Sequence, residues 1–270
     1  MTTPAEALGN KAGWIAARPV ELGPGLPAIG GQEPVICAPL VARTPEEALE
    51  QFLRLAARKP DLIEVRLDYL EGLAPEQTVT LLQALHAAAP VPLLATFRRQ
   101  EEGGARPLAE TGRLAILYAA LESGAIRLLD VELQTTSSAR QELLSASRSH
   151  GVATIISYHN FEVTPAYPAL VSTLKELAAT GADIVKMAVY PRTPEDTLNL
   201  LAASQEARTT FLDRPLVTMA MGALGGFTRL AGPFFGSALS FAVGENSSAP
   251  GQLEIDVVRA LWQNWQLRKA

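Results

Sequence analysis

Two hydrophobic patterns alternate along the chain from about residue 35 onward. One is a short, largely apolar run rich in β-branched residues, which is typical of a buried parallel strand. The other repeats its apolar residues every three to four positions, which is typical of an amphipathic helix. Strands are predicted at Val35–Val41, Leu62–Asp68, Val91–Phe97, Ile126–Glu132, Val152–Tyr158, Asp183–Val189, Pro215–Met219 and Ser237–Phe241.

Helical patterns fill the spaces between these strands. They are predicted at Thr44–Arg58, Pro75–Ala88, Leu108–Gly124, Ser137–His150, Pro165–Ala179, Thr193–Thr209, Gly225–Ala231 and Leu253–Leu267. Three of them open on a threonine followed by proline, at Thr44, Thr164 and Thr193, which is a helix start signal. Eight strands alternating with eight helices predict a (β/α)8 barrel, a TIM barrel, rather than an open doubly wound sheet.

Polar residues within the predicted strands alternate with apolar ones, so they all face the same side of their strand. This parity supports the barrel independently of the order of strands and helices. An open sheet covered by helices on both faces would bury these charges against apolar helices, whereas a barrel gives them one shared interior. They also lie toward the strands' C-terminal ends, where barrel enzymes place their chemistry. The pairs are Glu64 and Arg66, Thr96 and Arg98, Asp130 and Glu132, and Ser157 and His159.

The chain is predicted to form one catalytic domain over residues 34–270, preceded by an irregular extension over residues 1–33. The extension is rich in glycine and proline, with a possible short strand or hairpin at Pro19–Leu22. We assign it no chemistry.

The composition argues against several classes of function. The chain is 48% apolar and 19% charged with a net charge of −5 and no basic block, so we expect no nucleic-acid partner. One cysteine, Cys37, and three histidines without ligand spacing predict no disulfide, no metal site and no cofactor. Without a signal peptide or an apolar run of membrane-spanning length, we expect a cytoplasmic protein that contacts no membrane.

Lys186 is the most informative single residue, because it stands in the middle of an apolar strand. Alternation places Val185 and Val189 on one face and Lys186 with Ala188 on the other. Desolvation disfavours a charged amine, which leaves some neutral amine to attack a carbonyl. The structural alternatives are a lysine that reaches water along its stem or one paired with a carboxylate in the core.

His159 ends the neighbouring predicted strand, so its imidazole is expected close to Lys186. An amine beside an imidazole suits imine chemistry, in which the lysine forms a Schiff base and the histidine moves protons. Arginines at the same mouth imply an anionic small-molecule substrate, because guanidinium groups grip carboxylates or phosphates. The charged residues expected at the mouth are Glu64, Arg66, Arg98, Glu102 and Arg229.

From about residue 35 to the C-terminus the chain resembles the type I 3-dehydroquinate dehydratases, a shikimate-pathway family with a Schiff-base lysine. The motifs that carry the resemblance are Glu64–Asp68, Thr96–Arg98, Glu102–Gly104, Asp130–Leu133, Ser157–Phe161 with Thr164 and Pro165, Ala182–Lys186, Arg229–Gly232, Phe235–Ser237 and Ser248–Gln252. They occur in the family's order and spacing.

The resemblance implies dehydration of 3-dehydroquinate to 3-dehydroshikimate in aromatic amino acid biosynthesis. It implies an imine on Lys186, proton transfer by His159, and a tuning role for Glu102, with neighbouring Glu101 left as an alternative. It also implies a homodimer. The residues it implies in substrate binding are Glu64, Arg66, Arg98, Arg229, Ser248 and Gln252, with Arg229 the best candidate for the carboxylate.

Two other functions remain open from the sequence. A class I aldolase acting on a sugar phosphate is one, with Gly222–Gly226 as its phosphate loop. A catalytically silent barrel that binds a metabolite is the other, although such a protein gains nothing from a buried amine. We further predict that the loop Gly244–Gln252 is a lid over the barrel mouth, because it follows the last predicted strand.

Overall fold

The computed structural model describes residues 14–269 and confirms the barrel. Its strands lie side by side in the order β7-β6-β5-β4-β3-β2-β1-β8, and every pairing between neighbours is parallel. The strands are β1 (Val35–Leu40), β2 (Leu62–Arg66), β3 (Leu93–Thr96), β4 (Leu128–Glu132), β5 (Ala153–Asn160), β6 (Ile184–Val189), β7 (Leu216–Ala220) and β8 (Leu239–Phe241).

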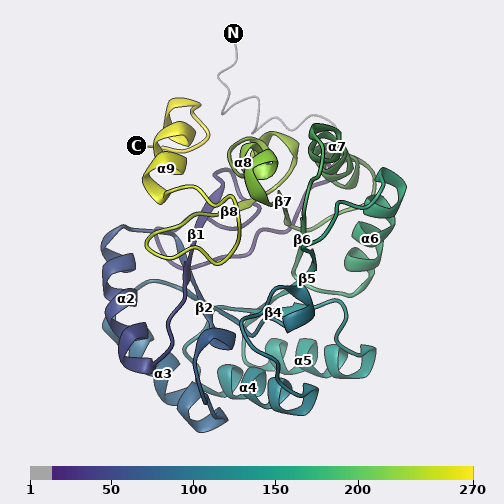
Figure 1. Cartoon of the computed structure of the whole chain (residues 1–270). Coiled ribbons are helices and arrows are strands. Elements are labelled where there is room, and N and C mark those ends of the chain that lie inside the picture. The colour runs from purple at the N-terminus through teal and green to yellow at the C-terminus, as the bar shows by residue number, and fades with distance from the viewer. Residues whose placement is uncertain (1–13, 270) are drawn as a thin grey trace.

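The helices form a ring around these strands (Figure 1). They are α2 (Pro45–Ala57), α3 (Pro75–Ala88), α4 (Glu110–Glu122), α5 (Ser137–Ser149), α6 (Tyr167–Ala179), α7 (Pro194–Thr210), α8 (Gly222–Ala231) and α9 (Ile255–Asn264). Short 3₁₀ turns follow at η1 (Leu67–Tyr69), η2 (Gln100–Glu102) and η3 (Gly232–Phe235).

The barrel closes where β7 meets the chain leading into β8. Leu216 and Ser237 form a parallel bridge, and the backbone N–H of Ala238 donates to the carbonyl of Leu216 at 2.7 Å. Closure satisfies backbone groups that two sheet edges would otherwise expose.

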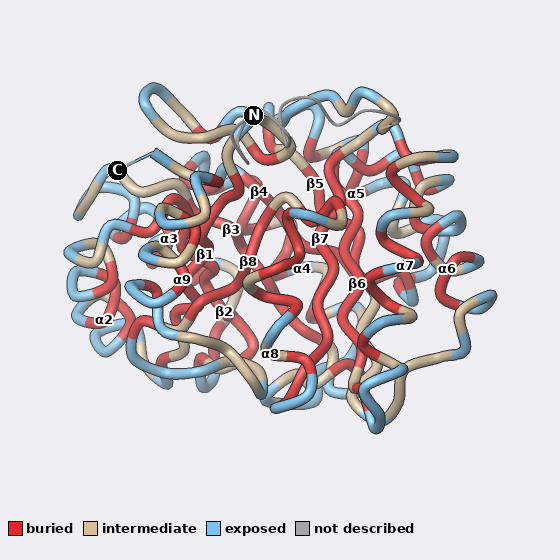
Figure 2. The backbone as a smooth tube through the Cα atoms, turned by 90° about the horizontal axis from the view of Figure 1, so that it is seen from above, coloured by how far each residue is buried: buried red, intermediate tan, exposed pale blue. Residues whose placement is uncertain are grey.

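The parity predicted for the strands is confirmed. Along β6, Val185 and Val189 belong to the apolar layer between barrel and helices, whereas Ile184 and Ala188 belong to the cluster inside the barrel. Buried residues follow the strands through the centre of the molecule, and exposed residues lie on the outer helices and loops (Figure 2). Lys186 therefore points into the barrel.

The chain before β1 packs into the base of this barrel. Val20 and Ile29 exchange two backbone hydrogen bonds of 2.9 Å in one antiparallel bridge, so the possible short strand or hairpin at Pro19–Leu22 is present as this single bridge. Leu22 and Ile29 are buried among the residues that fill the interior. The division of the chain at residue 33 stays a prediction, and residues 1–13 lie outside the described part.

Helix starts agree with the sequence in two of three cases. The Thr44 and Thr193 hydroxyls each accept a backbone N–H of the first turn at 3.2 Å, and a proline follows each. The start at Thr164 is wrong, because α6 begins at Tyr167 with Ala166 as its N-cap. The second strand is also shorter than predicted, since the chain turns into η1 after Arg66.

Within residues 14–269, no helix is both long and apolar enough to cross a membrane.

Candidate active site

A pocket with about 410 Å³ of empty space opens at the C-terminal ends of the strands. Apolar side chains complete its wall, among them Phe161, Met219, Met221 and Phe241. All nine residues singled out from the sequence line it: Glu64, Arg66, Arg98, Glu102, His159, Lys186, Arg229, Ser248 and Gln252. Strands and loops far apart in the sequence therefore meet in one cavity.

Lys186 stands in the wall of this pocket and is only 4% exposed. Its Nζ lies 3.0 Å from Oδ2 of Asp130, 3.9 Å from Oε1 of Glu64 and 4.4 Å from the ring centre of Phe241. The core ion pair considered as an alternative thus exists. The ion pair does not remove the amine from the cavity. The interpretation of Lys186 as an ion-pair partner and its interpretation as a reactive amine are therefore compatible.

His159 is held by Glu102. The backbone N–H of His159 donates to Glu102 Oε2 at 3.0 Å, and the ring Nδ1 lies 2.9 Å from the same oxygen. Because that oxygen already accepts the backbone N–H, we assign the ring Nδ1–H as its second donor, which leaves Nε2 without a hydrogen. Glu101, by contrast, has a 72% exposed side chain and lies beside Arg99. Glu102 is therefore the partner of His159.

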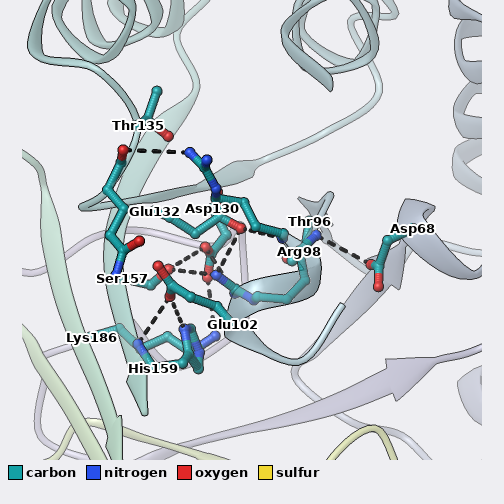
Figure 3. Close-up of polar contacts among 12 residues, drawn as sticks. Asp68, Thr96, Arg98, Glu102, Asp130, Glu132, Thr135, Ser157, His159 and Lys186 are labelled. Carbon is teal, nitrogen blue, oxygen red and sulfur yellow. Dashed lines mark hydrogen bonds and ion pairs between the residues drawn. The ribbon is translucent and has the colours of Figure 1, made fainter. Parts of the chain in front are cut away.

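Burial shapes the ionisation of this pair. Desolvation and the positive charges of Arg98 and Lys186 lower the pKa of His159 well below its usual value, so the imidazole is neutral and able to accept a proton. Desolvation also raises the pKa of Glu102 to about 8. Its other oxygen, Oε1, is buried without a hydrogen-bond partner in residues 14–269. Figure 3 shows Lys186 and His159 beside each other, with Glu102 against the imidazole.

Two of the three arginines are already paired with carboxylates. Arg66 forms two hydrogen bonds to Asp68, at 2.9 and 2.8 Å. Arg98 contacts Asp130 at 2.9 Å and Glu132 at 3.2 Å. These ion pairs orient the guanidinium groups, but they also neutralise most of the charge.

Arg229 differs from the other two. Its Nη atoms contact the carbonyls of Phe241 and Pro250 at 3.4 and 3.1 Å, and its Nε is buried without a partner. Among residues 14–269 it forms no ion pair, and desolvation lowers its pKa to about 10. A buried cation that lacks a counter-charge is the strongest anion site in the pocket.

The loop over the mouth carries Ser248 and Gln252, whose side chains bond to each other at 3.2 Å. The glycine-rich stretch at Gly222–Gly226 is the first part of helix α8 rather than a loop. Its Gly222 N–H donates to the carbonyl of Pro250, and a Cβ on Gly225 would lie 2.2 Å from the backbone of Ala220. Gly225 serves close packing and the Gly222 N–H is bonded within the protein, so this stretch gives the sugar-phosphate alternative no support.

Three charged residues of the site were not singled out from the sequence. Asp130 and Glu132 hold Arg98, and Arg113 on α4 donates to Glu132 at 2.7 Å. The inward parity of Asp130 and Glu132 was the available signal. Arg113 had none, because it reaches the site from outside the barrel.

These features define a class: a barrel enzyme with an amine and an imidazole at its C-terminal mouth, beside a buried guanidinium that has no carboxylate partner within residues 14–269. A family model for type I 3-dehydroquinase matches residues 36–267. The chain is 45% identical over 237 residues to a 3-dehydroquinate dehydratase of Geobacillus thermodenitrificans, covering 86% of this chain and 90% of the relative. The chain belongs to the type I 3-dehydroquinase family and is a hydro-lyase.

Solved structures agree with this assignment. A 3-dehydroquinate dehydratase from Geobacillus kaustophilus superposes with a TM-score of 0.89 at 38% identity, over 95% of this chain and all of that one. A type I 3-dehydroquinate dehydratase from Clostridium difficile, with covalently modified comenic acid, has a TM-score of 0.87 at 30% identity, over 94% of this chain and 99% of that one.

Proposed function

We propose that this chain dehydrates 3-dehydroquinate to 3-dehydroshikimate through an imine on Lys186, as part of the shikimate pathway of aromatic amino acid biosynthesis. The observation that carries the proposal is the meeting of a buried Lys186 and a neutral His159 in one cavity beside Arg229, which has no carboxylate partner within residues 14–269. The chemistry needs those groups: a nucleophilic amine, a base and a site for the substrate carboxylate.

In the first step Nζ of Lys186 attacks the ketone. A C=N bond forms, the C=O bond breaks, and the ketone oxygen leaves as water with two of the three ammonium protons. The product is a protonated imine that keeps one N–H. This cation withdraws electrons from the adjacent carbon and so acidifies its C–H bond far more than the ketone does.

In the second step Nε2 of His159 takes that proton, and the electron pair moves onto the imine nitrogen to form an enamine. The electrons then return and expel the β-hydroxyl, which leaves as water with the proton from His159. Water finally hydrolyses the imine and frees Lys186. Because the imine itself serves as the electron sink, we expect dialysis against EDTA to leave the rate unchanged.

The remaining residues of the pocket bind the substrate in this proposal. Arg229 takes the carboxylate, because its charge has no other partner in residues 14–269. Glu64, which accepts from Thr96 at 2.9 Å, has lone pairs left for a substrate hydroxyl. Arg66, Arg98, Ser248 and Gln252 supply further donors around the ring.

Borohydride trapping tests the proposal. Added together with 3-dehydroquinate, borohydride should reduce the imine to a stable adduct that peptide mapping places on Lys186. Lys186→Ala should abolish both the adduct and the absorbance of the conjugated product, whereas Lys175→Ala, at an exposed lysine on α6, should change neither. An adduct on another lysine would show that the assignment is wrong.

The role of His159 is tested separately from that of Lys186. His159→Ala should still form the trapped imine while it loses about 10²–10⁴-fold in turnover, the usual contribution of a general acid–base group. Near-normal turnover in this variant would assign the base to another group.

We also propose a homodimer that works in the cytoplasm. Large apolar side chains are exposed on two neighbouring helices: Leu198 on α7 at 64%, and Leu224 and Phe227 on α8 at 45% and 57%. Thr197 bonds to the carbonyl of Leu224, so these helices present one surface. Sedimentation should show a dimer that Phe227→Glu dissociates.

A further inference from the structure

Asp130 lies directly behind the amine of Lys186. Its carboxylate is buried in the interior, with its Oδ2 atom 3.0 Å from Nζ. Asp130 is absent from the lining of the pocket, whereas Lys186 is part of it. The carboxylate is therefore on the far side of the amine from the space that a substrate would fill.

The other oxygen of Asp130 is fixed by two donors. Oδ1 contacts Arg98 Nη2 at 2.9 Å and accepts the Ser157 hydroxyl at 2.6 Å. Arg98 is itself held by Glu132, which Arg113 contacts from α4 at 2.7 Å. Figure 3 shows Asp130 at the centre of these contacts, between Arg98 and Lys186. With Oδ1 occupied, Oδ2 is left to face Nζ.

We propose that Asp130 is a catalytic counter-ion that accepts the single N–H of the protonated imine and so keeps the imine charged. The inference rests on the proposed imine at Lys186. After condensation the nitrogen retains one of its three hydrogens, and Oδ2 already lies within hydrogen-bond distance on the side away from the substrate. A charged imine is the electron sink, and a neutral imine acidifies the adjacent C–H much less.

The buried site makes this pairing more effective once substrate is bound. A substrate that fills the pocket expels water, and the attraction between a carboxylate and a cation grows as the local dielectric constant falls. The partner is also pre-positioned, so that no reorganisation is needed when the imine forms.

Glu64 is the competing candidate for this role. Its Oε1 is 3.9 Å from Nζ, beyond hydrogen-bond distance, and accepts from Thr96 instead. Glu64 also lines the pocket and therefore faces the substrate. Its removal is expected to weaken substrate binding rather than imine formation.

The experiment compares Asp130→Asn with Asp61→Asn in the full-length enzyme. Asp61 is a matched control, because it too is a buried aspartate paired with an arginine, Arg268, and it bonds to the backbone N–H of Ile36 at the start of β1. Each variant is mixed with saturating 3-dehydroquinate and borohydride, and intact mass gives the fraction of enzyme trapped. Steady-state assays give kcat and KM.

We expect Asp130→Asn to lower kcat by about 10²-fold, the scale of losing one pre-positioned electrostatic partner. The trapped fraction should fall with it, KM should stay within a few-fold, and Asp61→Asn should trap like the wild type. Ser157→Ala, which removes one donor to Oδ1 and keeps the charge, should lower both quantities in the same direction but less. If Asp130→Asn does not fold, the result for Ser157→Ala tests the proposal in its place.

Wild-type trapping or turnover in Asp130→Asn would overturn the proposal, as would lost turnover with an undiminished trapped fraction. Loss of trapping in Glu64→Gln but not in Asp130→Asn would assign the counter-ion to Glu64. If the wild-type enzyme itself gives no adduct on Lys186, the proposed function fails instead, so the two failures are distinguishable.

Discussion

At the scale of single residues, the charged groups of the pocket differ in whether a buried charge has a partner of opposite charge. Arg66 and Arg98 keep carboxylate partners at 2.8–3.2 Å, whereas Arg229 contacts carbonyls and a thioether. Desolvation by burial is the physical reason for the raised pKa of Glu102, whose Oε1 also lacks a hydrogen-bond partner within residues 14–269. Such groups destabilise the free enzyme, and in the proposed mechanism they serve substrate binding and catalysis.

The raised pKa of Glu102 predicts a pH-dependent stability. The pKa is about 8 in the folded protein against a reference value of 4.5, so between these values the folded state holds one proton more than the unfolded state. The free energy of unfolding therefore falls as pH rises through this window, by up to about 1.4 kcal/mol per pH unit. Glu102→Gln has no proton to lose and should show a flatter dependence.

Urea unfolding of the wild type and of Glu102→Gln at pH 6.5, 7.25 and 8 measures how the free energy of unfolding depends on pH in each protein. His159 acts in the opposite direction near pH 6.5, because its imidazole is neutral in the folded state but partly protonated in the unfolded chain. Both proteins carry His159, so the difference between their pH slopes reports on Glu102. Parallel pH slopes in the wild type and in Glu102→Gln would contradict the prediction.

At the scale of elements, the loop between β8 and α9 is tied to the barrel at its ends and at Pro250. Glu245 pairs with Arg54 at 2.6 Å, and the carbonyl of Pro250 accepts from Gly222 N–H and from Arg229, both at 3.1 Å. A substrate carboxylate that binds Arg229 would compete with one of these contacts. Between the anchors, Ser248 and Gln252 bond mainly within the loop.

We expect this loop to behave as a lid. Its residues bury little apolar surface, so opening requires little free energy, and closure would exclude water from the imine. A protease should cut within Gly244–Gln252 in the free enzyme, and bound substrate or product should protect the loop. Equal cleavage in both states would rule out closure.

The contribution of the lid to binding is predicted to be modest. Gln252→Ala should weaken binding by about 1–2 kcal/mol, the scale of a hydrogen bond to a charged group, while Lys186 stays trappable at saturating substrate. Gln263→Ala on α9, whose amide donates to the carbonyl of Lys269, is the matched control and should bind like the wild type.

At the scale of the whole molecule, the two ends of the barrel have different tasks. The C-terminal end is polar and holds the pocket, whereas the base is filled by apolar side chains that include Leu22 and Ile29. The chain before β1 therefore contributes stability from the end opposite the chemistry.

Ile29→Ala tests this division. Ile29 is 0% exposed, so truncation should reduce the free energy of unfolding by about 2–5 kcal/mol. Because the pocket lies at the other end, kcat and KM at a temperature below unfolding should remain those of the wild type. Thermal unfolding and steady-state assays measure the two quantities, and a large rise in KM would indicate that the base shapes the pocket.

Periodicity along the chain was sufficient to predict the order of strands and helices and the inward direction of Lys186. These features depend on local alternation, because successive side chains of a strand face opposite sides and polar residues of one parity therefore share the barrel interior. Most of the nine pocket residues were predictable because residues at the C-terminal ends of strands converge when a barrel closes. Ser248 and Gln252 followed only from the resemblance to the family. Boundaries were less predictable, as at Thr164, because a start signal competes with the geometry of the preceding loop.

Only the tertiary structure decided which charges pair. The sequence left Glu101 as an alternative to Glu102. It showed the inward parity of Asp130, but nothing in it paired this aspartate with Lys186, 56 positions later. It also could not show that, within residues 14–269, Arg229 is the one of the three pocket arginines without a carboxylate partner. Ion pairs form over a few ångströms between residues distant in sequence, so their choice depends on how strands and helices pack and not on any local pattern.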